Sequence, residues 1–273
     1  MMLHLRSSLA EYVLQLQTEG RVSFTRAQAM AALRMSETAF LKAAERLQKK
    51  GALISPRQGF YVVVPPQYLS WKAPPPSWYI DDLMRHEGRP YYVGLLKAAE
   101  LHGATHHAVM EFQVVTDKQL PKIRAGRSII AFYYRKDLGS VLPGVIDRKT
   151  DTGSMKLSSP ELTALDLVRY AHASGGIDSV ATVFADLKDS LDGAKLATLA
   201  DRYERAVIQR VGYLLDRLDA EGKTQELHRH LASRTPLPWT PLEPQKCGAR
   251  KSEPVERNGR WRVLVHREPE IDT

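Results

Sequence analysis

The chain has 273 residues, of which 43% are hydrophobic and 26% are charged, so a packed core and up to two domains are expected. No apolar run approaches the roughly 20 residues that a membrane-spanning helix needs, and the amphipathic N-terminus is unlike a secretory signal. The single cysteine, Cys247, excludes an internal disulfide and a multi-cysteine zinc site. These features predict a cytoplasmic protein that does not enter a membrane.

The positive charge is concentrated at the start of the chain. The formal net charge is +8, and residues 1–65 contain nine lysines and arginines against four glutamates. Residues 66–273 contain 30 basic and 27 acidic residues. A basic segment of this kind indicates a polyanionic partner, and we look for DNA-binding elements within it.

The first 33 residues predict two helices separated by a short extended run. Apolar side chains recur at spacings of three and four over residues 3–17, and residues 21–24 alternate. Thr25 and Gln28 form the capping-box pattern that begins a second helix. The face predicted to be buried in that helix comprises Ala27, Met30, Ala31 and Leu33.

A third helix and a hairpin follow directly. Ser36 can cap the helix, and Gly51 ends it after two lysines that suit the negative end of the helix dipole. Residues 52–55 and 59–65 read as two strands joined by a tight turn. The predicted inward face of the third helix is Ala39, Phe40, Ala43, Ala44 and Leu47. Helix, strand, helix, helix and hairpin is the order of a winged helix-turn-helix.

This order assigns DNA contacts to specific side chains. The third helix fits the major groove with the face that its core residues leave free, the hairpin tip reaches a phosphate or the minor groove, and the start of the second helix anchors to backbone phosphate. The predicted contact residues are Arg26, Gln28, Ser36, Thr38, Lys42, Arg46, Lys49, Arg57 and Gln58. The alternative is a helical packing or protein-binding module whose lysines are a solvated face.

The rest of the chain predicts a proline-rich linker and a larger mixed domain. Five prolines fall between residues 65 and 76, which favours a semi-rigid linker over 66–78. Beyond it, the patterns predict helices over 78–88, 91–103, 158–176, 177–190, 194–219 and 223–232, and strands over 112–116, 127–136, 141–149, 153–158 and 261–266. The expected fold class is α+β: a winged helix-turn-helix at 1–65 and an α+β domain at 79–273, with its terminal strand near 260–266.

Two clusters invite a chemical interpretation, and neither makes a convincing site. His102, His106 and His107 lie close together, but no HExxH pattern accompanies them. The acid pairs Asp81/Asp82 and Asp147/Asp151 resemble nuclease carboxylates, although solvated helix-start charges are the better explanation. We therefore predict no catalytic residues, no metal and no cofactor.

Residues 89–136, "RPYYVGLLKAAELHGATHHAVMEFQVVTDKQLPKIRAGRSIIAFYYRK", resemble the signature region of the AbiEi antitoxin family. The flanking "GFYVVVPPQY" at 59–68 and "WRVLV" at 261–265 are similar to the family as well. The resemblance extends over nearly the whole chain, and its motifs are mainly hydrophobic framework.

The resemblance implies a two-domain regulator from a type IV toxin–antitoxin, or abortive-infection, system. The N-terminal winged helix would bind inverted repeats of double-stranded DNA in its own promoter and repress it. The C-terminal domain would support cooperative binding and counter a nucleotidyltransferase-like toxin, in direct contact or without it. The protein would be a monomer or a weak dimer. The following residues form either a second basic surface or plain solubilising charge: Arg85, Arg89, Lys97, Lys122, Arg124 and Arg127.

Two alternatives to the repressor and antitoxin remain open at this stage. The first is a DNA-guided nuclease or nucleotide-processing enzyme that uses Asp81, Asp82, Asp147 and Asp151. The second is a regulator whose larger domain senses a small effector, which a pocket with convergent polar groups would favour.

Overall fold

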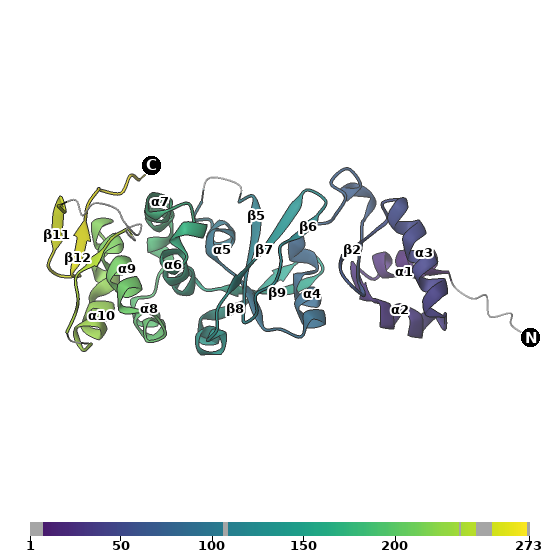
Figure 1. The fold of residues 1–273 in the computed structure, drawn as a ribbon, viewed down its shortest axis with the longest axis horizontal. Coiled ribbons are helices and arrows are strands. Elements are labelled where there is room, and N and C mark those ends of the chain that lie inside the picture. The colour runs from purple at the N-terminus through teal and green to yellow at the C-terminus, as the bar shows by residue number, and fades with distance from the viewer. Residues whose placement is uncertain (1–7, 106–108, 235, 244–252, 272–273) are drawn as a thin grey trace, which may run out of the picture. The chain divides into compact units, whose positions relative to one another are not determined.

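The structure is a computed structural model that describes residues 8–105, 109–234, 236–243 and 253–271 (Figure 1). The chain divides into two compact units. The first unit comprises residues 1–92, 110–136 and 147–156, and the second comprises 93–109, 137–146 and 157–273. The chain therefore passes between the units several times.

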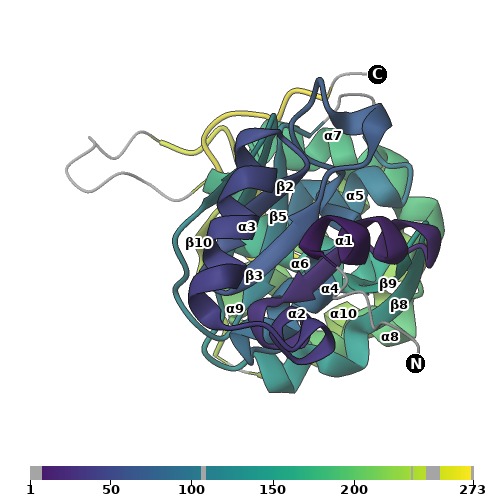
Figure 2. The same ribbon diagram turned by 90° about the vertical axis from the view of Figure 1, so that its right-hand side faces the viewer.

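Residues 8–65 form a module of three helices and a small sheet, which we call the N-terminal module. Its elements are α1 (Leu9–Thr18), β1 (Ser23–Thr25), α2 (Arg26–Leu33), α3 (Glu37–Lys49), β2 (Leu53–Arg57) and β3 (Phe60–Val63). The strands pair antiparallel in the order β1-β3-β2. Figure 2 shows the three helices arranged around this sheet. The order of helices and strands is the one predicted from the sequence.

Aromatic side chains hold the module together. Phe24 stacks on Tyr61 with ring centroids 5.5 Å apart, and Phe40 meets the same tyrosine edge-on at 5.2 Å. Leu9, Val13 and further small apolar residues complete this core. Such aromatic pairs contribute beyond the area that they bury, so the geometry of α3 is fixed by packing as well as by its caps.

Local signals in the sequence placed the starts of α2, α3 and α6 (Pro160–Arg169) correctly, whereas α1, predicted from residue 3, begins at Leu9. Ser8, Thr25, Ser36 and Ser159 each cap the helix that follows, by accepting a hydrogen bond from a backbone amide of its first turn. The buried face of α2 was predicted in part. Met30 and Leu33 pack against the core as expected, whereas Ala27 and Ala31 are exposed and Ala29 is buried.

The remaining strands of the first unit belong to a six-stranded mixed sheet in the order β6-β7-β5-β4-β9-β8. Strands β5 and β7 run parallel, and β6 is antiparallel to β7. The strands are β4 (Tyr91–Val93), β5 (Glu111–Thr116), β6 (Ile123–Ala125), β7 (Ser128–Tyr134), β8 (Val145–Thr150) and β9 (Gly153–Ser158), and α4 (Ile80–Glu87) precedes them. Helix α4 and the three predicted strands within 112–136 and 153–158 lie where expected.

The predicted linker is bonded to the first unit and is partly helical. It contains the short 3-10 helices η1 (Pro66–Tyr68) and η2 (Pro76–Trp78). Trp78 Nε1 donates to Asp151 Oδ2 at 2.8 Å, and Thr152 Oγ1 donates to the Trp78 carbonyl at 2.7 Å. The segment therefore lies against its own unit.

The second unit is mainly helical. Its elements are α5 (Leu95–Leu101), η3 (Leu138–Gly144), α6 (Pro160–Arg169), η4 (Ala171–Ala173), α7 (Ile177–Leu187), η5 (Lys188–Ser190), α8 (Gly193–Ala200), α9 (Arg205–Arg217), α10 (Glu221–Ala232), and the strands β10 (Thr240–Pro241), β11 (Glu256–Asn258) and β12 (Val263–Val265). The last three strands form a small sheet in the order β10-β12-β11. Helices and sheets together make the chain an α+β protein, as predicted.

Three segments differ from the sequence-based expectation. Tyr91–Val93 was assigned to a helix and forms β4, fully within the sheet. Residues 141–144 belong to η3 and not to a strand. The predicted helix over 194–219 is two helices, because the Tyr203 hydroxyl donates to Asp166 and Glu204 pairs with Arg169 at the break. Each difference arises from contacts distant in the sequence.

Candidate nucleic-acid interface

Helix α3 presents one face to the core and the other to solvent. Phe40 and Ala44 are buried, which fixes the opposite face as the outward one. At its start, Ser36 Oγ accepts a hydrogen bond from the Ala39 amide at 3.3 Å. Ser36 therefore fixes where α3 begins. Ala39, which was predicted to face inward, is exposed.

The outward face of α3 carries the predicted cations. Thr38, Lys42, Arg46 and Lys49 are all exposed. Lys42 forms no ion pair with any residue that the structure describes, whereas Lys49 Nζ lies 2.7 Å from Glu45 Oε1. Lys49 lowers the pKa of the Glu45 carboxyl through a hydrogen bond and its charge, so Glu45 is ionised. An exposed pair of this kind is weak and can exchange for a phosphate.

The start of α2 is tied to α3 and to the hairpin. The Arg26 guanidinium pairs with the Glu37 carboxylate at the start of α3, and the Arg26 amide donates to the Gly59 carbonyl at 2.8 Å. Gln28 Oε1 accepts from the Thr25 amide at 2.8 Å, which completes the predicted capping box. Arg26 and Gln28 thus organise the corner between the two helices.

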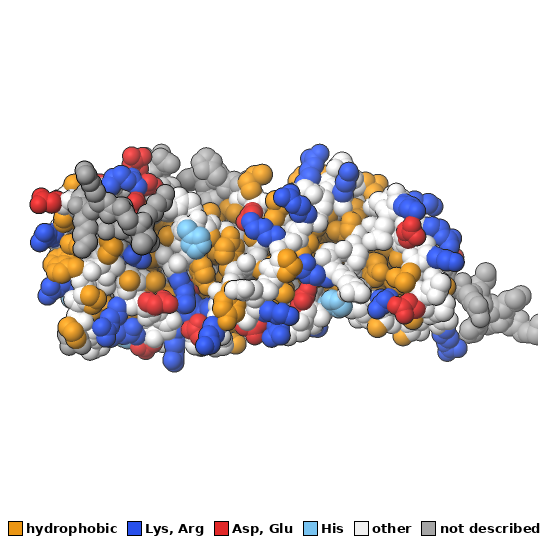
Figure 3. All heavy atoms as spheres, in the orientation of Figure 1, with side chains coloured by type: hydrophobic (Ala, Val, Ile, Leu, Met, Phe, Trp, Pro, Cys, Tyr) orange, Lys and Arg blue, Asp and Glu red, His pale blue; other side chains and the backbone are white. Residues whose placement is uncertain are grey.

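Two exposed cations near α3 escaped the sequence-based prediction. Arg34 is the C-cap of α2 and has a left-handed backbone, with φ of 48°. Lys50 is the C-cap of α3. Neither forms an ion pair with the part of the chain that the structure describes. Their signal was available in the sequence, since both stand beside a predicted helix end. Figure 3 shows Lys and Arg side chains gathered over the end of the first unit that carries α3.

The hairpin tip, where Arg57 and Gln58 were predicted to contact DNA, is bonded to other parts of its own unit. The Arg57 Nε atom lies 2.8 Å from Glu87 Oε1, and its NH2 group donates to the Pro121 carbonyl at 2.7 Å. The guanidinium also lies 5.7 Å from the centre of the Phe132 ring. Both partners of the ion pair are more than four-fifths buried, with side-chain exposures of 19% and 18%. Arg57 is thus committed to other groups of its own unit, and it is not available to a phosphate in this arrangement.

Gln58 lies beside the same contact. Its carbonyl oxygen is 3.0 Å from His86 Nε2, so the ring nitrogen donates to it. The neighbouring Phe60 ring is 5.5 Å from the His86 ring. The Gln58 side chain is exposed. We call the contacts of Arg57 and Gln58 with α4, Pro121 and Phe132 the hairpin latch.

The four candidate nuclease carboxylates are each bonded to neighbouring side chains, and Asp81 and Asp82 share Arg85 as an ionic partner. Asp81 accepts from the Tyr91 hydroxyl at 2.9 Å, and Asp82 accepts from the Ser23 hydroxyl at 2.6 Å. Asp147 pairs with Lys156, and Asp151 accepts from Trp78. Among the described residues, no three histidine, cysteine, aspartate or glutamate side chains come together as a metal site. These carboxylates therefore do not converge on one reaction centre.

The histidine cluster contains one residue with a clear structural role. His102 Nε2 lies 2.8 Å from the Ser158 carbonyl oxygen, which is a structural hydrogen bond. His106 and His107 lie outside the described residues.

The expected second basic surface is not one continuous patch. Three of these cations lie in the first unit and form ion pairs there. Arg85 pairs with Asp81 and Asp82. Arg89 pairs with Asp117, and Lys122 pairs with Glu111. Arg127 of the same unit lies over the Trp71 ring at 5.9 Å, and Arg124 is exposed. Lys97 belongs to the second unit, where it pairs with Glu100. The structure thus favours α3 over this set as the main basic face.

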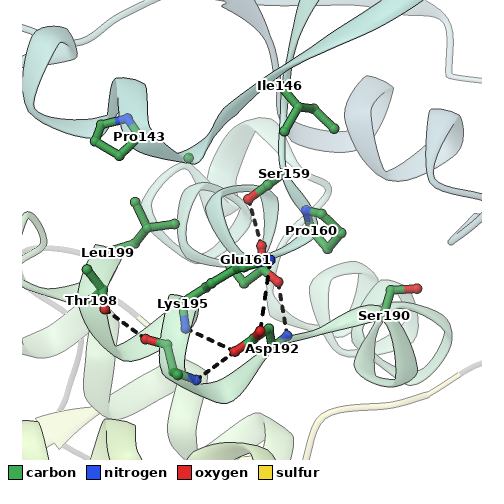
Figure 4. A pocket seen from close by; sticks show the side chains of 12 residues that line it. Pro143, Ile146, Ser159, Pro160, Glu161, Ser190, Asp192, Lys195, Thr198 and Leu199 are labelled. Carbon is green, nitrogen blue, oxygen red and sulfur yellow. Dashed lines mark hydrogen bonds and ion pairs between the residues drawn. The ribbon is translucent and has the colours of Figure 1, made fainter.

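A pocket of about 490 Å³ opens in the second unit between the first turns of α6 and α8 (Figure 4). Its polar residues bond to one another: Glu161 accepts from the Ser159 hydroxyl at 2.7 Å and from the Asp192 amide at 2.9 Å. Asp192 in turn caps α8 by accepting from the Ala194 and Lys195 amides. These groups bond the start of α6 to the start of α8. The pocket lining therefore does not identify a particular effector.

The middle of the chain matches a known protein-family model. Residues 92–217 match the model of the AbiEi antitoxin C-terminal domain. The crystal structure of the RV2827C protein from Mycobacterium tuberculosis has a similar fold, with a TM-score of 0.66 at 16% sequence identity, over 95% of this chain and 92% of that one. No curated protein matches the chain. Of the helices that the structure describes, none is both long enough and apolar enough to cross a bilayer.

Proposed function

We propose that this chain, whose residues 92–217 match the model of the AbiEi antitoxin C-terminal domain, is the antitoxin of a type IV toxin–antitoxin system and a DNA-binding repressor of its own promoter. In this proposal the N-terminal module is a winged helix-turn-helix, and α3 enters the major groove of an inverted repeat. The protein acts in the cytoplasm without catalysis, and counters a nucleotidyltransferase-like toxin.

The observation that carries the DNA-binding role is the outward face of α3. Lys42 is exposed and has no ionic partner within the described chain, and Arg46 and Lys49 stand one and two turns further on the same helix. A helix of this width fits the major groove, and cations along its exposed side can neutralise phosphates. Arg26 and Gln28 lie at the start of α2, which the Arg26 amide bonds to the hairpin, and their side chains can contact a backbone phosphate there.

DNA binding is tested with a duplex that covers the inverted repeats upstream of the reading frame. We expect a Kd that rises steeply with salt, because counterions are released from each phosphate that is neutralised. Replacing Lys42 and Lys49 with alanine should weaken binding about 10- to 100-fold and flatten the salt slope by about one for each phosphate that is no longer neutralised. The matched control is Lys195→Ala with Arg229→Ala, two exposed cations of the second unit.

Equal operator affinity in the α3 variant and the wild type would remove α3 from the interface. Equally weakened binding in the α3 variant and in the control would mean that the effect is one of net charge.

The antitoxin role is tested separately, in cells that express the adjacent toxin reading frame. The full chain should restore growth. We expect the Lys42→Ala/Lys49→Ala variant, expressed from an unrelated promoter, to restore growth as well, because the family match lies outside the N-terminal module. Failure of the full chain to restore growth would contradict the antitoxin role and leave the DNA-binding result standing.

A further inference from the structure

The exposed surface of α3 has two chemically different sides. Successive residues of an α-helix are about 100° apart, so residues three, four and seven apart share a side. One side is basic and carries Lys42, Arg46, Lys49 and Lys50. The other carries Thr38, Leu41, Glu45 and Gln48, which we call the mixed stripe. Both face solvent and adjoin each other, since Thr38 stands four residues before Lys42 and Glu45 four before Lys49, and Phe40 and Ala44 mark the buried side opposite their border.

These two sides suit different parts of a duplex. Lysine and arginine neutralise phosphates, whereas threonine, glutamate, glutamine and apolar side chains recognise base edges. In the proposed complex, the basic side of α3 follows the phosphates of one strand and the mixed stripe faces the bases.

Leu41 is the apolar member of the mixed stripe, and 44% of its surface is exposed. A lone exposed leucine on a protein surface is ordinary, and Leu14 of α1 is another, at 61%. Leu41 differs in its position. It lies one turn from both Thr38 and Glu45, on the helix whose cations would hold it against the duplex. In the major groove the apolar group on a base edge is the 5-methyl group of thymine.

We propose that Leu41 is a specificity-determining residue that packs on the 5-methyl group of a thymine in each operator half-site. The proposal rests on the proposed function, since it requires that α3 enters the groove, and it adds the base that one side chain selects. Burying one methyl group is worth about 0.8 kcal/mol, which is about fourfold in Kd.

The experiment replaces each thymine of the operator, one at a time, with deoxyuridine, which lacks only the methyl group. We expect wild-type protein to bind about fourfold more weakly when one particular thymine in a half-site is changed. The Leu41→Ala variant should bind the unmodified operator about as weakly as the wild type binds that modified one, and should be indifferent to the change. Leu41→Met should retain the sensitivity, and Leu14→Ala should behave as the wild type does.

The outcomes separate this inference from the proposed function. If Leu41→Ala keeps the wild-type sensitivity to deoxyuridine, or if no thymine methyl matters to the wild type, the inference is wrong while DNA binding by α3 stands. If wild-type protein shows no preference for the operator over unrelated DNA, the proposed function fails and takes this inference with it.

Discussion

Helix α3 and the β2–β3 hairpin are two basic segments of one small module, and their arginines and lysines have opposite surroundings. On α3, Lys42 is exposed and has no ionic partner in the described chain. In the hairpin, Arg57 is mostly buried and bonded to Glu87 and Pro121. A local surplus of positive charge therefore does not by itself locate a DNA-binding surface. A lysine or arginine is available to a DNA phosphate only where no carboxylate of the protein already pairs with it.

The hairpin latch also gives the N-terminal module a fixed place within its unit. Its partners lie 30 and 64 residues from Arg57 in the sequence. The Ser23 hydroxyl adds a hydrogen bond to Asp82 of α4 from the adjacent strand. We therefore expect α3 variants to change DNA affinity without changing stability, and latch variants to change stability without changing DNA affinity.

The largest effect is expected from reversing a charge on α3. Lys42→Glu should weaken operator binding about 100-fold, because it removes one attraction and sets a carboxylate against the phosphates. Its free energy of unfolding should stay within about 0.5 kcal/mol of the wild-type value, since the side chain is exposed. Anisotropy titrations and urea unfolding of the same preparation measure both quantities. A large drop in stability together with weakened binding would contradict the claim that Lys42 contributes to DNA binding and not to folding.

The next effect is expected from the latch. Arg57→Ala should lower the free energy of unfolding by about 2 kcal/mol, because it removes an ion pair and a hydrogen bond and leaves Glu87 mostly buried without its partner. Operator affinity of the folded protein should change less than about twofold, because Arg57 neutralises no phosphate in this arrangement. The matched control is Arg85→Ala on the same helix as Glu87. Its side chain is 71% exposed, and its pairs with Asp81 and Asp82 are worth little.

A Glu87→Gln variant decides between a latch and a hidden DNA contact. If Arg57 serves only the latch, this variant is less stable and binds the operator as before. Should it instead bind DNA more tightly than the wild type, Arg57 would be a phosphate ligand that Glu87 holds back, and the hairpin would return to the interface.

The latch also illustrates which parts of the molecule could be predicted from the sequence. Helix starts were predictable because caps act within three residues, as at Ser36 and Ser159. The outward face of α3 followed from helical spacing alone. The role of Arg57 could not be predicted, since its partners come from α4 and from the approach to β6. Tyr91–Val93 was assigned to a helix for the same reason: its neighbours in the sheet, β5 and β9, begin 18 or more residues further along the chain.

The smallest effect is expected at Arg34, the cation in the turn before α3. Its φ of 48° is a conformation that glycine adopts without strain. Arg34→Gly should therefore change the free energy of unfolding by less than about 1 kcal/mol, because two effects oppose each other. Relief of backbone strain stabilises the folded state, and the greater conformational freedom of glycine stabilises the unfolded state. If Arg34 contacts a phosphate, the same variant flattens the salt slope of operator binding by about one. Arg34→Lys retains the charge and the strain and should keep the slope. An unchanged slope in Arg34→Gly would confine the phosphate contacts to α3 itself and to the start of α2.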